Sequence, residues 1–267
     1  MAVASQMNIN NKQNRVLAAL PVAEYERLQP HLQVVPVSTG EVLYELGAPV
    51  KYLYFPLNCV MSLVYEMENG TSSELSIVGS EGVVGISSIM GRETAPNRAV
   101  VQSEGHALRI HADALQKEFQ RGGVLQMQLL RYTHALMIQM AQTGLCNRHH
   151  CVQQQVCRWL LVMQDHFRNR ELDVTQQHIA DMLGVRREGV TQAAGVLQDI
   201  GWIRYSRGRI LVVDRQGLEG GACECYQIIK KEYGRLLHHE RYRTCSTSKQ
   251  PASPRQPSQS NYCVATL

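Results

Sequence analysis

The stretch Thr175–Leu197, TQQHIADMLGVRREGVTQAAGVL, has the pattern of two short helices joined by a tight turn. Ala180 is small enough for the point where two such helices cross, and Gly184 stands in the turn, where φ is often positive. Thr175 is a favourable N-cap for the first helix. Apolar residues at helical spacing can hold the helices together: Ile179, Leu183, Val185, Val190 and Ala193. This combination is typical of a helix-turn-helix.

The outer side of this unit carries side chains that can bind DNA. Arginine can pair with guanine, glutamine with adenine, and glutamate can accept a hydrogen bond from cytosine. The next segment, Gly201–Asp214, predicts two strands around a turn, a wing suited to phosphate contacts. The predicted DNA-binding residues are Thr175, Gln176, Gln177, Arg186, Arg187, Glu188, Thr191, Gln192, Arg204, Ser206, Arg207 and Arg209. The alternative is a solvated helical hairpin with unrelated surface charge, but the joint pattern favours DNA.

The sequence pattern before this unit is different: from Leu32 to Ile110, short β-rich runs alternate with residues typical of turns. Asn69-Gly70 suits the positive φ values of a tight hairpin turn. Many short strands at even spacing predict an antiparallel sandwich or roll. The fold class is therefore α+β: an N-terminal antiparallel β-roll or jelly roll, a long dimerisation helix and a C-terminal winged helix-turn-helix.

The long helix is predicted between the two domains, where apolar residues recur at steps of three and four. The predicted seam consists of Leu125, Leu129, Tyr132, Leu136, Met140 and Thr143. So apolar a stripe, directly after a β domain, favours packing against a second copy of the helix. The alternative is a single helix buried within its own domain.

These patterns divide the chain into segments with different expected roles. They are a disordered arm 1–14, a β-roll sensor domain 15–120, a dimerisation helix 121–146, a winged helix-turn-helix 147–220, a C-terminal helix 221–242 and a disordered tail 243–267. The tail is rich in Ser, Pro and Gln and has no apolar core.

Composition narrows the class of protein. The hydrophobic share of 44% is ordinary for a folded protein. The formal net charge of +4 permits an acidic partner without requiring one. The sequence predicts neither a signal peptide nor a membrane span, so we expect a cytoplasmic protein whose cysteines are reduced. We find no convergent acid–base pair, nucleophile setting or phosphate loop, and therefore expect no enzyme.

Over nearly its whole length the chain resembles the Crp/Fnr family of bacterial transcription regulators. The glycine-punctuated β-rich region, the long helix and above all the stretch from Val174 to Asp214 carry the resemblance. It implies a homodimer joined along the long helix, with double-stranded DNA as partner and RNA polymerase as a further partner if the protein activates. In the family, Arg-Glu in the recognition helix is often followed four residues later by Arg; here Arg187 and Glu188 match, but Gln192 replaces the last arginine.

The resemblance also locates an effector pocket, here degenerate. Family members that bind cyclic nucleotides hold the ribose with Gly-Glu-Leu and the phosphate with Arg-Ser or Arg-Thr. In this chain Ile86 stands in the place of the glutamate, and Asn97-Arg98 in that of the second pair. The candidate pocket residues are Gly85, Ile86, Ser87, Arg92, Asn97 and Arg98. We therefore expect no control by cAMP.

Cofactors are the remaining question, since the family includes iron–sulfur and haem sensors. An iron–sulfur cluster needs grouped thiolates, and the cysteines are scattered in the sequence. Cys223 and Cys225 lack obvious partners, and Arg148–Cys151 is best explained as a polar connector. No metal or other cofactor is assigned. The predicted function is a homodimeric regulator of an inverted-repeat site; the alternative is a sensor of haem, metal or another small molecule whose DNA binding depends on that effector.

Overall fold

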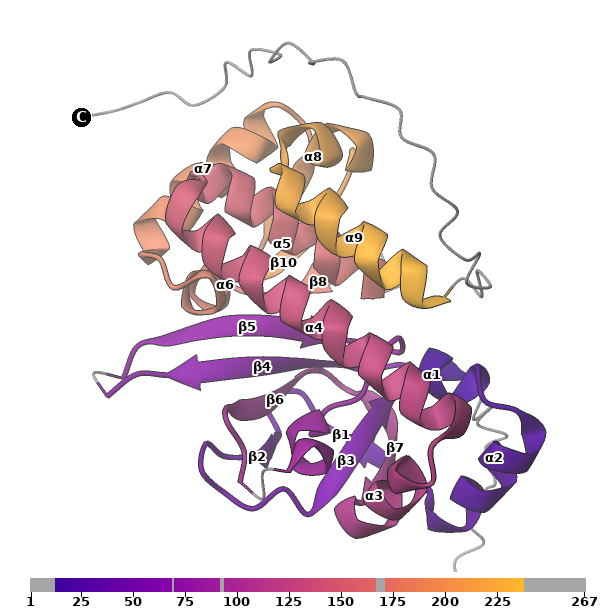
Figure 1. The fold of residues 1–267 in the computed structure, drawn as a ribbon. Coiled ribbons are helices and arrows are strands. Elements are labelled where there is room, and N and C mark those ends of the chain that lie inside the picture. The colour runs from indigo at the N-terminus through magenta and orange to yellow at the C-terminus, as the bar shows by residue number, and fades with distance from the viewer. Residues whose placement is uncertain (1–12, 69, 92–93, 167–170, 238–267) are drawn as a thin grey trace, which may run out of the picture.

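Two antiparallel sheets enclose the hydrophobic core of the N-terminal domain (Figure 1). The computed structural model describes residues 13–68, 70–91, 94–166 and 171–237. One sheet has the order β1-β7-β3, formed by Gln33–Val37, Gly105–His111 and Tyr52–Pro56. The other has the order β2-β6-β4-β5, formed by Val42–Tyr44, Arg98–Ser103, Val60–Glu66 and Ser72–Val78. The predicted antiparallel β-roll is confirmed.

Alternation of side chains explains how these strands build the core. In β3, Leu53 and Phe55 are fully buried, whereas Tyr52 and Tyr54 on the opposite face are partly exposed. The β4–β5 pair is a hairpin, as predicted, and Gly70 in its turn has φ +79°. The preceding Asn69 lies outside the described residues.

The N-terminal helices α1 (Arg15–Ala18) and α2 (Val22–Leu28) pack against the core of the roll. Asn14, predicted to belong to a disordered arm, is fully buried instead. Its Oδ1 accepts hydrogen bonds from the amides of Val16 and Leu17, and its Nδ2 donates to the carbonyl of Gly82 over 2.9 Å. This N-cap ties the chain to the β-roll, so the predicted arm is corrected at Asn14; residues 1–12 lie outside the described part.

The helices α3 (Ala112–Gln120) and α4 (Gly123–His149) follow the roll, and α4 crosses the front of the molecule (Figure 1). The helix continues past the predicted end at residue 146. The predicted seam residues face the chain's own interior: Leu125, Leu129, Tyr132, Leu136 and Thr143 are buried, and Met140 is half-buried. The assignment of these side chains to a dimer contact is therefore corrected. Except for Thr143, they pack in or against the hydrophobic core of the β-roll.

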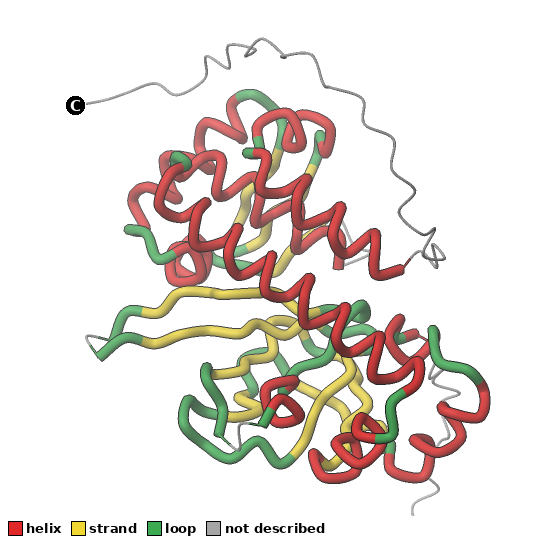
Figure 2. The backbone as a smooth tube through the Cα atoms, viewed as in Figure 1, coloured by secondary structure: helices red, strands yellow, loops and turns green. Residues whose placement is uncertain are grey.

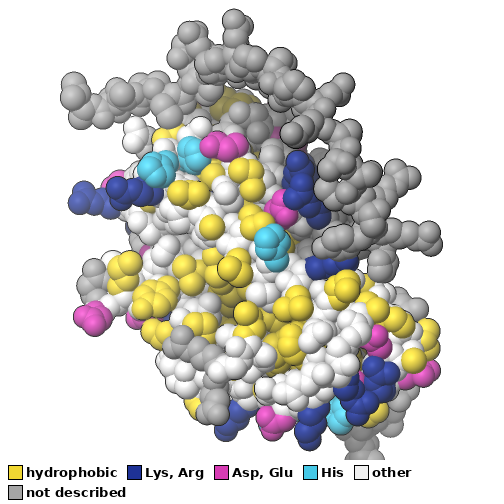
Figure 3. Space-filling view, viewed as in Figure 1, with side chains coloured by type: hydrophobic (Ala, Val, Ile, Leu, Met, Phe, Trp, Pro, Cys, Tyr) yellow, Lys and Arg dark blue, Asp and Glu magenta, His cyan; other side chains and the backbone are white. Residues whose placement is uncertain are grey.

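A second apolar stripe lies on the opposite face of α4. Met127, Leu130, Met137 and Leu145 are each at least half exposed. Together with His134 and Ala141, also exposed, they recur at steps of three and four, and from Met127 to Ala141 these steps alternate as in a heptad. We call these six residues the outer stripe of α4; hydrophobic side chains gather along this helix in Figure 3. Sequence periodicity missed it because α4 has apolar residues on both faces.

The C-terminal domain combines helices with a small antiparallel sheet (Figure 2). Its elements are α5 (Val152–His166), β8 (Glu171–Asp173), α6 (Gln176–Leu183), α7 (Arg187–Asp199), β9 (Ile203–Ser206), β10 (Arg209–Val212), α8 (Arg215–Gly221) and α9 (Glu224–Leu237). The strand order is β8-β10-β9. The predicted C-terminal helix 221–242 corresponds to α9, and the tail 243–267 lies outside the described residues. Among the described helices, none has the length and apolar character that a membrane span requires.

The two domains share a contact across the β4–β5 hairpin. Trp159 of α5 is fully buried, and its Nε1 donates to Glu74 Oε1 of β5 over 3.2 Å. Ser62 of β4 donates to the other oxygen of Glu74 over 2.6 Å. Val60, Val64 and Ile77 of the hairpin belong to the hydrophobic core of the C-terminal domain. The β4–β5 hairpin is therefore part of the base on which the C-terminal helices rest.

The carboxyl group of Glu74 should make this contact sensitive to pH. Burial raises the pKa of Glu74 to about 7, against the opposing effects of the Ser62 hydrogen bond and the Arg158 charge. The folded protein therefore holds a proton that the unfolded chain releases near pH 4.5. Stability should fall by about 3 kcal/mol as the pH rises from about 4.5 to 7. Glu74→Gln keeps an acceptor for Trp159 but cannot ionise, so its stability should lack this pH dependence.

Urea unfolding of both proteins between pH 4 and 8 measures the effect. The unfolding free energy of the original chain should fall relative to that of Glu74→Gln between about pH 4.5 and 7. Above that range the difference between the two proteins should stay constant. Parallel curves over the whole range would show that Glu74 does not titrate in this way.

Candidate nucleic-acid interface

The helix-turn-helix begins and turns as its sequence predicts. Thr175 Oγ1 accepts a hydrogen bond from the amide of His178 over 3.1 Å, which caps α6. Gly184 ends α6 with φ +65°, and the amide of Val185 then donates to the carbonyl of Ala180 over 3.0 Å. The apolar residues predicted between the helices are buried, with Val185 only partly so.

The exposed face of α7 presents the predicted base-contacting side chains. Arg186 is the N-cap residue, and Arg187, Glu188, Thr191 and Gln192 follow on one side of the helix, all exposed. Among the described residues, neither arginine has an ion-pair partner, so both charges are available to a nucleic acid.

The first helix supports this face from the side. Thr191 Oγ1 donates to Gln176 Oε1 over 2.7 Å and joins the start of α6 to the first turns of α7. Gln177 is exposed on α6 and donates to Asp181 over 2.7 Å. Gln176 and Thr191 therefore orient each other, a relation that side-chain type alone did not predict.

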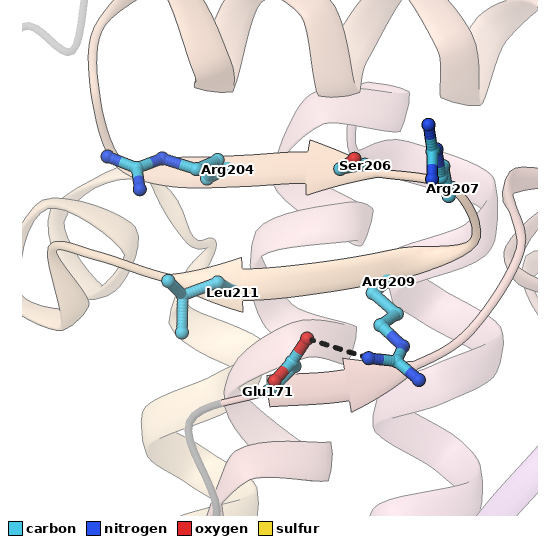
Figure 4. Close-up of a pocket in the computed structure, with 6 residues that line it drawn as sticks. All are labelled: Glu171, Arg204, Ser206, Arg207, Arg209 and Leu211. Atoms are coloured by element: carbon cyan, nitrogen blue, oxygen red, sulfur yellow. Dashed lines mark ion pairs between the residues drawn. The ribbon is translucent and has the colours of Figure 1, made fainter.

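The wing has the expected form, with Arg207 at φ +48° and Gly208 at φ +80° in the turn between β9 and β10. Arg204, Ser206 and Arg209 lie on the outer face of this sheet with Leu211 and Glu171, around a hollow of about 500 Å³ (Figure 4). Among the described residues, Arg204 and Arg207 have no ion-pair partner. Two positive charges thus stand where a phosphate backbone could meet the wing.

Arg209 differs from the other wing arginines. Its Nε lies 2.8 Å from Asp173 Oδ1 and its Nη1 lies 3.8 Å from Glu171 Oε1, both on β8. Arg209 reaches these carboxylates because β10 and β8 are adjacent antiparallel strands. The two carboxylates balance the charge of Arg209. Arg209 is therefore a weaker candidate for a phosphate contact than Arg204 or Arg207.

Part of this surface faces the N-terminal domain. A groove of about 450 Å³ is lined by Thr175 and Arg207 on one side and by Thr39, Val100 and Gln102 on the other. His178 Nε2 lies 2.7 Å from Gln102 Oε1 at this contact. The start of α6 and the tip of the wing thus lie beside β6 and the β1–β2 turn.

The candidate effector residues that the structure describes are buried among apolar side chains or already paired. Ile86 is buried in the apolar core, next to Gly85, which has φ +95°. Arg98 is paired with Glu45 over 3.2 Å and with Glu66 over 3.6 Å. Of the other candidates, Ser87 is partly buried, Asn97 is buried, and Arg92 lies outside the described residues. The place expected to hold a ribose is therefore filled by an aliphatic side chain, and the guanidinium is already paired with carboxylates.

Two family models match the chain in the order of these domains. The cyclic nucleotide-binding domain model matches residues 34–121, and the Crp-like helix-turn-helix domain model matches residues 154–220. The first covers the β-roll and α3, and the second covers α5 to α8.

Known proteins are similar to this one in sequence or in fold. The CRP-like cAMP-activated global transcriptional regulator of Mycobacterium tuberculosis H37Rv is 26% identical over 199 residues, which are 72% of this chain and 88% of that protein. The structure of FixK2 from Bradyrhizobium japonicum has a TM-score of 0.62 at 16% identity, over 72% of this chain and 98% of that one. A transcriptional regulator of the Crp/Fnr family from Eubacterium rectale has a TM-score of 0.63 at 18% identity, over 80% and 98%. With its β-roll followed by an exposed basic helix-turn-helix, the protein belongs to the Crp/Fnr family of DNA-binding transcription regulators.

Proposed function

We propose that the protein is a homodimeric regulator that binds an inverted-repeat DNA site without control by cAMP. The observation that carries this proposal is the exposed face of α7, where Arg187, Glu188 and Gln192 lie together and Arg187 has no ion-pair partner within the described part of the chain. A helix with such a face fits the major groove, in which these side chain types distinguish base pairs. We place its action in the cytoplasm, with RNA polymerase as a further partner if it activates.

The outer stripe of α4 supports a homodimer. Four large apolar side chains exposed along one face of a helix are costly in water unless another surface covers them. A second copy of α4 offers the same stripe, so a two-fold axis buries both at once. The same axis would place the two recognition helices on an inverted repeat, with half-sites roughly 10 or 20 base pairs apart.

Independence from cAMP is supported by the filled effector site. Ile86 offers no hydrogen bond to ribose hydroxyls, and the charge of Arg98 is balanced by Glu45 and Glu66. The phosphate of a cyclic nucleotide would have to displace these two carboxylates from Arg98. The site would also offer the ribose no carboxylate, because Ile86 stands in the place of the glutamate. The cAMP dependence of the mycobacterial relative is therefore not extended to this chain.

Selection from a random duplex library by the purified protein, with no small molecule added, tests the proposal. Recovery of an inverted repeat is the expected result. Recovery of a single unpaired half-site would contradict the dimer, and sequence-independent, salt-sensitive binding would contradict base recognition in this state.

Arg187 and Arg207 should affect DNA binding in different ways. Arg187→Ala should weaken the selected site by about 1–3 kcal/mol and relax one base position, because it removes a base contact. Arg207→Ala should weaken all sequences similarly and reduce the salt dependence by about one ion, because it removes a phosphate contact. Titration of selected and scrambled duplexes at several salt concentrations measures both effects.

Lys231→Ala is the matched control, since it removes one positive charge from an exposed position on α9, outside the predicted interface. It should change neither the affinity for DNA nor its salt dependence by more than the experimental error. If Arg187→Ala and Arg207→Ala weakened selected and scrambled duplexes alike, the division into base and phosphate contacts would be wrong.

The second candidate function is DNA binding that depends on an effector. The groove shared by Thr175 and Arg207 with Gln102 of the sensor domain favours it. A DNA backbone that reached both residues would have to enter this groove, so binding would require the domains to separate. In that case the library selection recovers no sequence until the signal molecule is added.

A further inference from the structure

Four side chains with metal-binding atoms meet where α4 ends and α9 begins. They are Cys146 near the end of α4, His150 in the connection to α5, Cys223 before α9 and Cys225 in its first turn. Their sulfur and nitrogen atoms all lie within 4.8 Å of one another. The three cysteines are buried and His150 is partly buried. This cluster lies outside both the DNA-binding face and the effector site.

The distances match those of a mononuclear tetrahedral site. Cys146 Sγ lies 3.4 Å from Cys223 Sγ, and Cys225 Sγ lies 3.7 Å from His150 Nδ1. In a tetrahedral zinc site, metal–sulfur bonds of about 2.3 Å place neighbouring ligand atoms about 3.8 Å apart. An ion could therefore be held with small side-chain movements. A four-iron cluster is larger than one ion and would have to push these atoms apart.

A buried arginine supplies the charge that such a site needs. Arg158 of α5 is buried, and its Nε donates to Cys146 Sγ over 3.2 Å. Three thiolates and one divalent ion leave a net charge of −1, which the guanidinium neutralises. A guanidinium is costly to bury unless an anion accompanies it. The position of Arg158 is thus explained by a thiolate centre.

The histidine is oriented as metal-bound histidines are. Its Nδ1 faces Cys225, while its Nε2 lies 3.4 Å from Glu224 Oε2. A carboxylate on the second ring nitrogen fixes the tautomer in which the first can donate its lone pair to a metal. His150 therefore turns its Nδ1 toward Cys225 and its Nε2 toward Glu224.

We propose that Cys146, His150, Cys223 and Cys225 bind one zinc ion, which joins the start of α9 to the α4–α5 connection. Three soft thiolates with one imidazole select zinc over magnesium or calcium, which prefer oxygen ligands. Sequence spacing concealed the site, because 77 residues separate Cys146 from Cys223 and the Cys223–Cys225 spacing is unusual for zinc. The interpretation of Arg148–Cys151 as only a polar connector is revised at His150.

Metal titration of the reduced, chelator-treated full-length protein tests the site. Cobalt(II) should bind at one ion per chain and develop the thiolate charge-transfer and visible bands of tetrahedral coordination. One equivalent of zinc should remove those bands and raise the Tm. The absence of such bands, or a stoichiometry well below one, would overturn the proposal without reference to any variant.

Variants then locate the ligands. Cys225→Ser and Cys223→Ser should weaken zinc binding at least 100-fold against a chromophoric chelator, and His150→Ala at least 10-fold. Cys151→Ser is the matched control, since Cys151 adjoins His150 but lies outside the cluster; it should bind zinc normally. Equal losses in Cys151→Ser and Cys225→Ser would contradict the assignment. Mass spectrometry after alkylation covers the remaining outcome: a Cys146–Cys223 disulfide with no bound metal would overturn it.

Discussion

Replacing Trp159 with alanine should lower the unfolding free energy of the C-terminal domain by about 3–5 kcal/mol, the range for large aromatic residues removed from a core. Trp159 is among the largest fully buried side chains and packs in the second hydrophobic core. The same substitution removes its hydrogen bond to Glu74. It therefore weakens both the C-terminal core and the contact between the domains.

Urea unfolding followed by two probes measures this effect, because a two-domain chain need not unfold in one step. The chain has two tryptophans, so fluorescence of the variant reports Trp202 in the C-terminal domain alone. Circular dichroism follows both domains. A loss below about 1 kcal/mol would contradict the central role of Trp159.

Two further variants separate volume from hydrogen bonding. Trp159→Phe keeps a large apolar ring but no donor for Glu74, and should cost about 1–2 kcal/mol. Val196→Ala, at an exposed apolar position of α7, should cost less than about 0.5 kcal/mol. A loss in Val196→Ala as large as that in Trp159→Ala would show that the effect is not specific to the buried indole.

The second large effect is expected at the outer stripe of α4. Met137→Glu should raise the dimer dissociation constant at least 100-fold, or about 3 kcal/mol. Met137 is 62% exposed in the single chain, so glutamate should not disturb the fold. In the dimer, the carboxylate would be buried among apolar side chains without a partner. Sedimentation over a range of protein concentrations measures the dissociation constant.

Met137→Leu controls for the loss of methionine, because it keeps the side chain apolar and of similar volume. Gln227→Glu adds the same charge at an exposed position of α9. Both should remain dimers, and both should still bind the inverted repeat. A dimer of unchanged affinity in Met137→Glu would exclude the outer stripe as the interface.

Local sequence patterns were sufficient for the helix-turn-helix. The cap at Thr175, the turn at Gly184 and the wing at Gly208 depend on residues close together in the chain. Their conformations follow from local hydrogen bonds and from the freedom of glycine at positive φ. The strands of the β-roll were predictable for the same reason, since alternation along a strand is a local property.

Periodicity could not decide which face of α4 is covered. Leu129 and Leu130 are adjacent, yet the first is fully buried and the second is half exposed. Both faces of the helix carry apolar residues at helical spacing, so only the position of the β-roll distinguishes them. That position results from packing between segments far apart in the sequence.

The sequence by itself determined the domain order, the exposed face of α7 that is predicted to contact DNA, and the caps and turns that position it. Only the tertiary structure decided which face of α4 stays exposed, that Glu74 meets Trp159, and that Cys146, His150, Cys223 and Cys225 come together. The first group depends on neighbours within a few residues of one another. The second depends on how two hydrophobic cores dock and bring α9 beside α4, which burial of apolar surface drives and which no local pattern encodes.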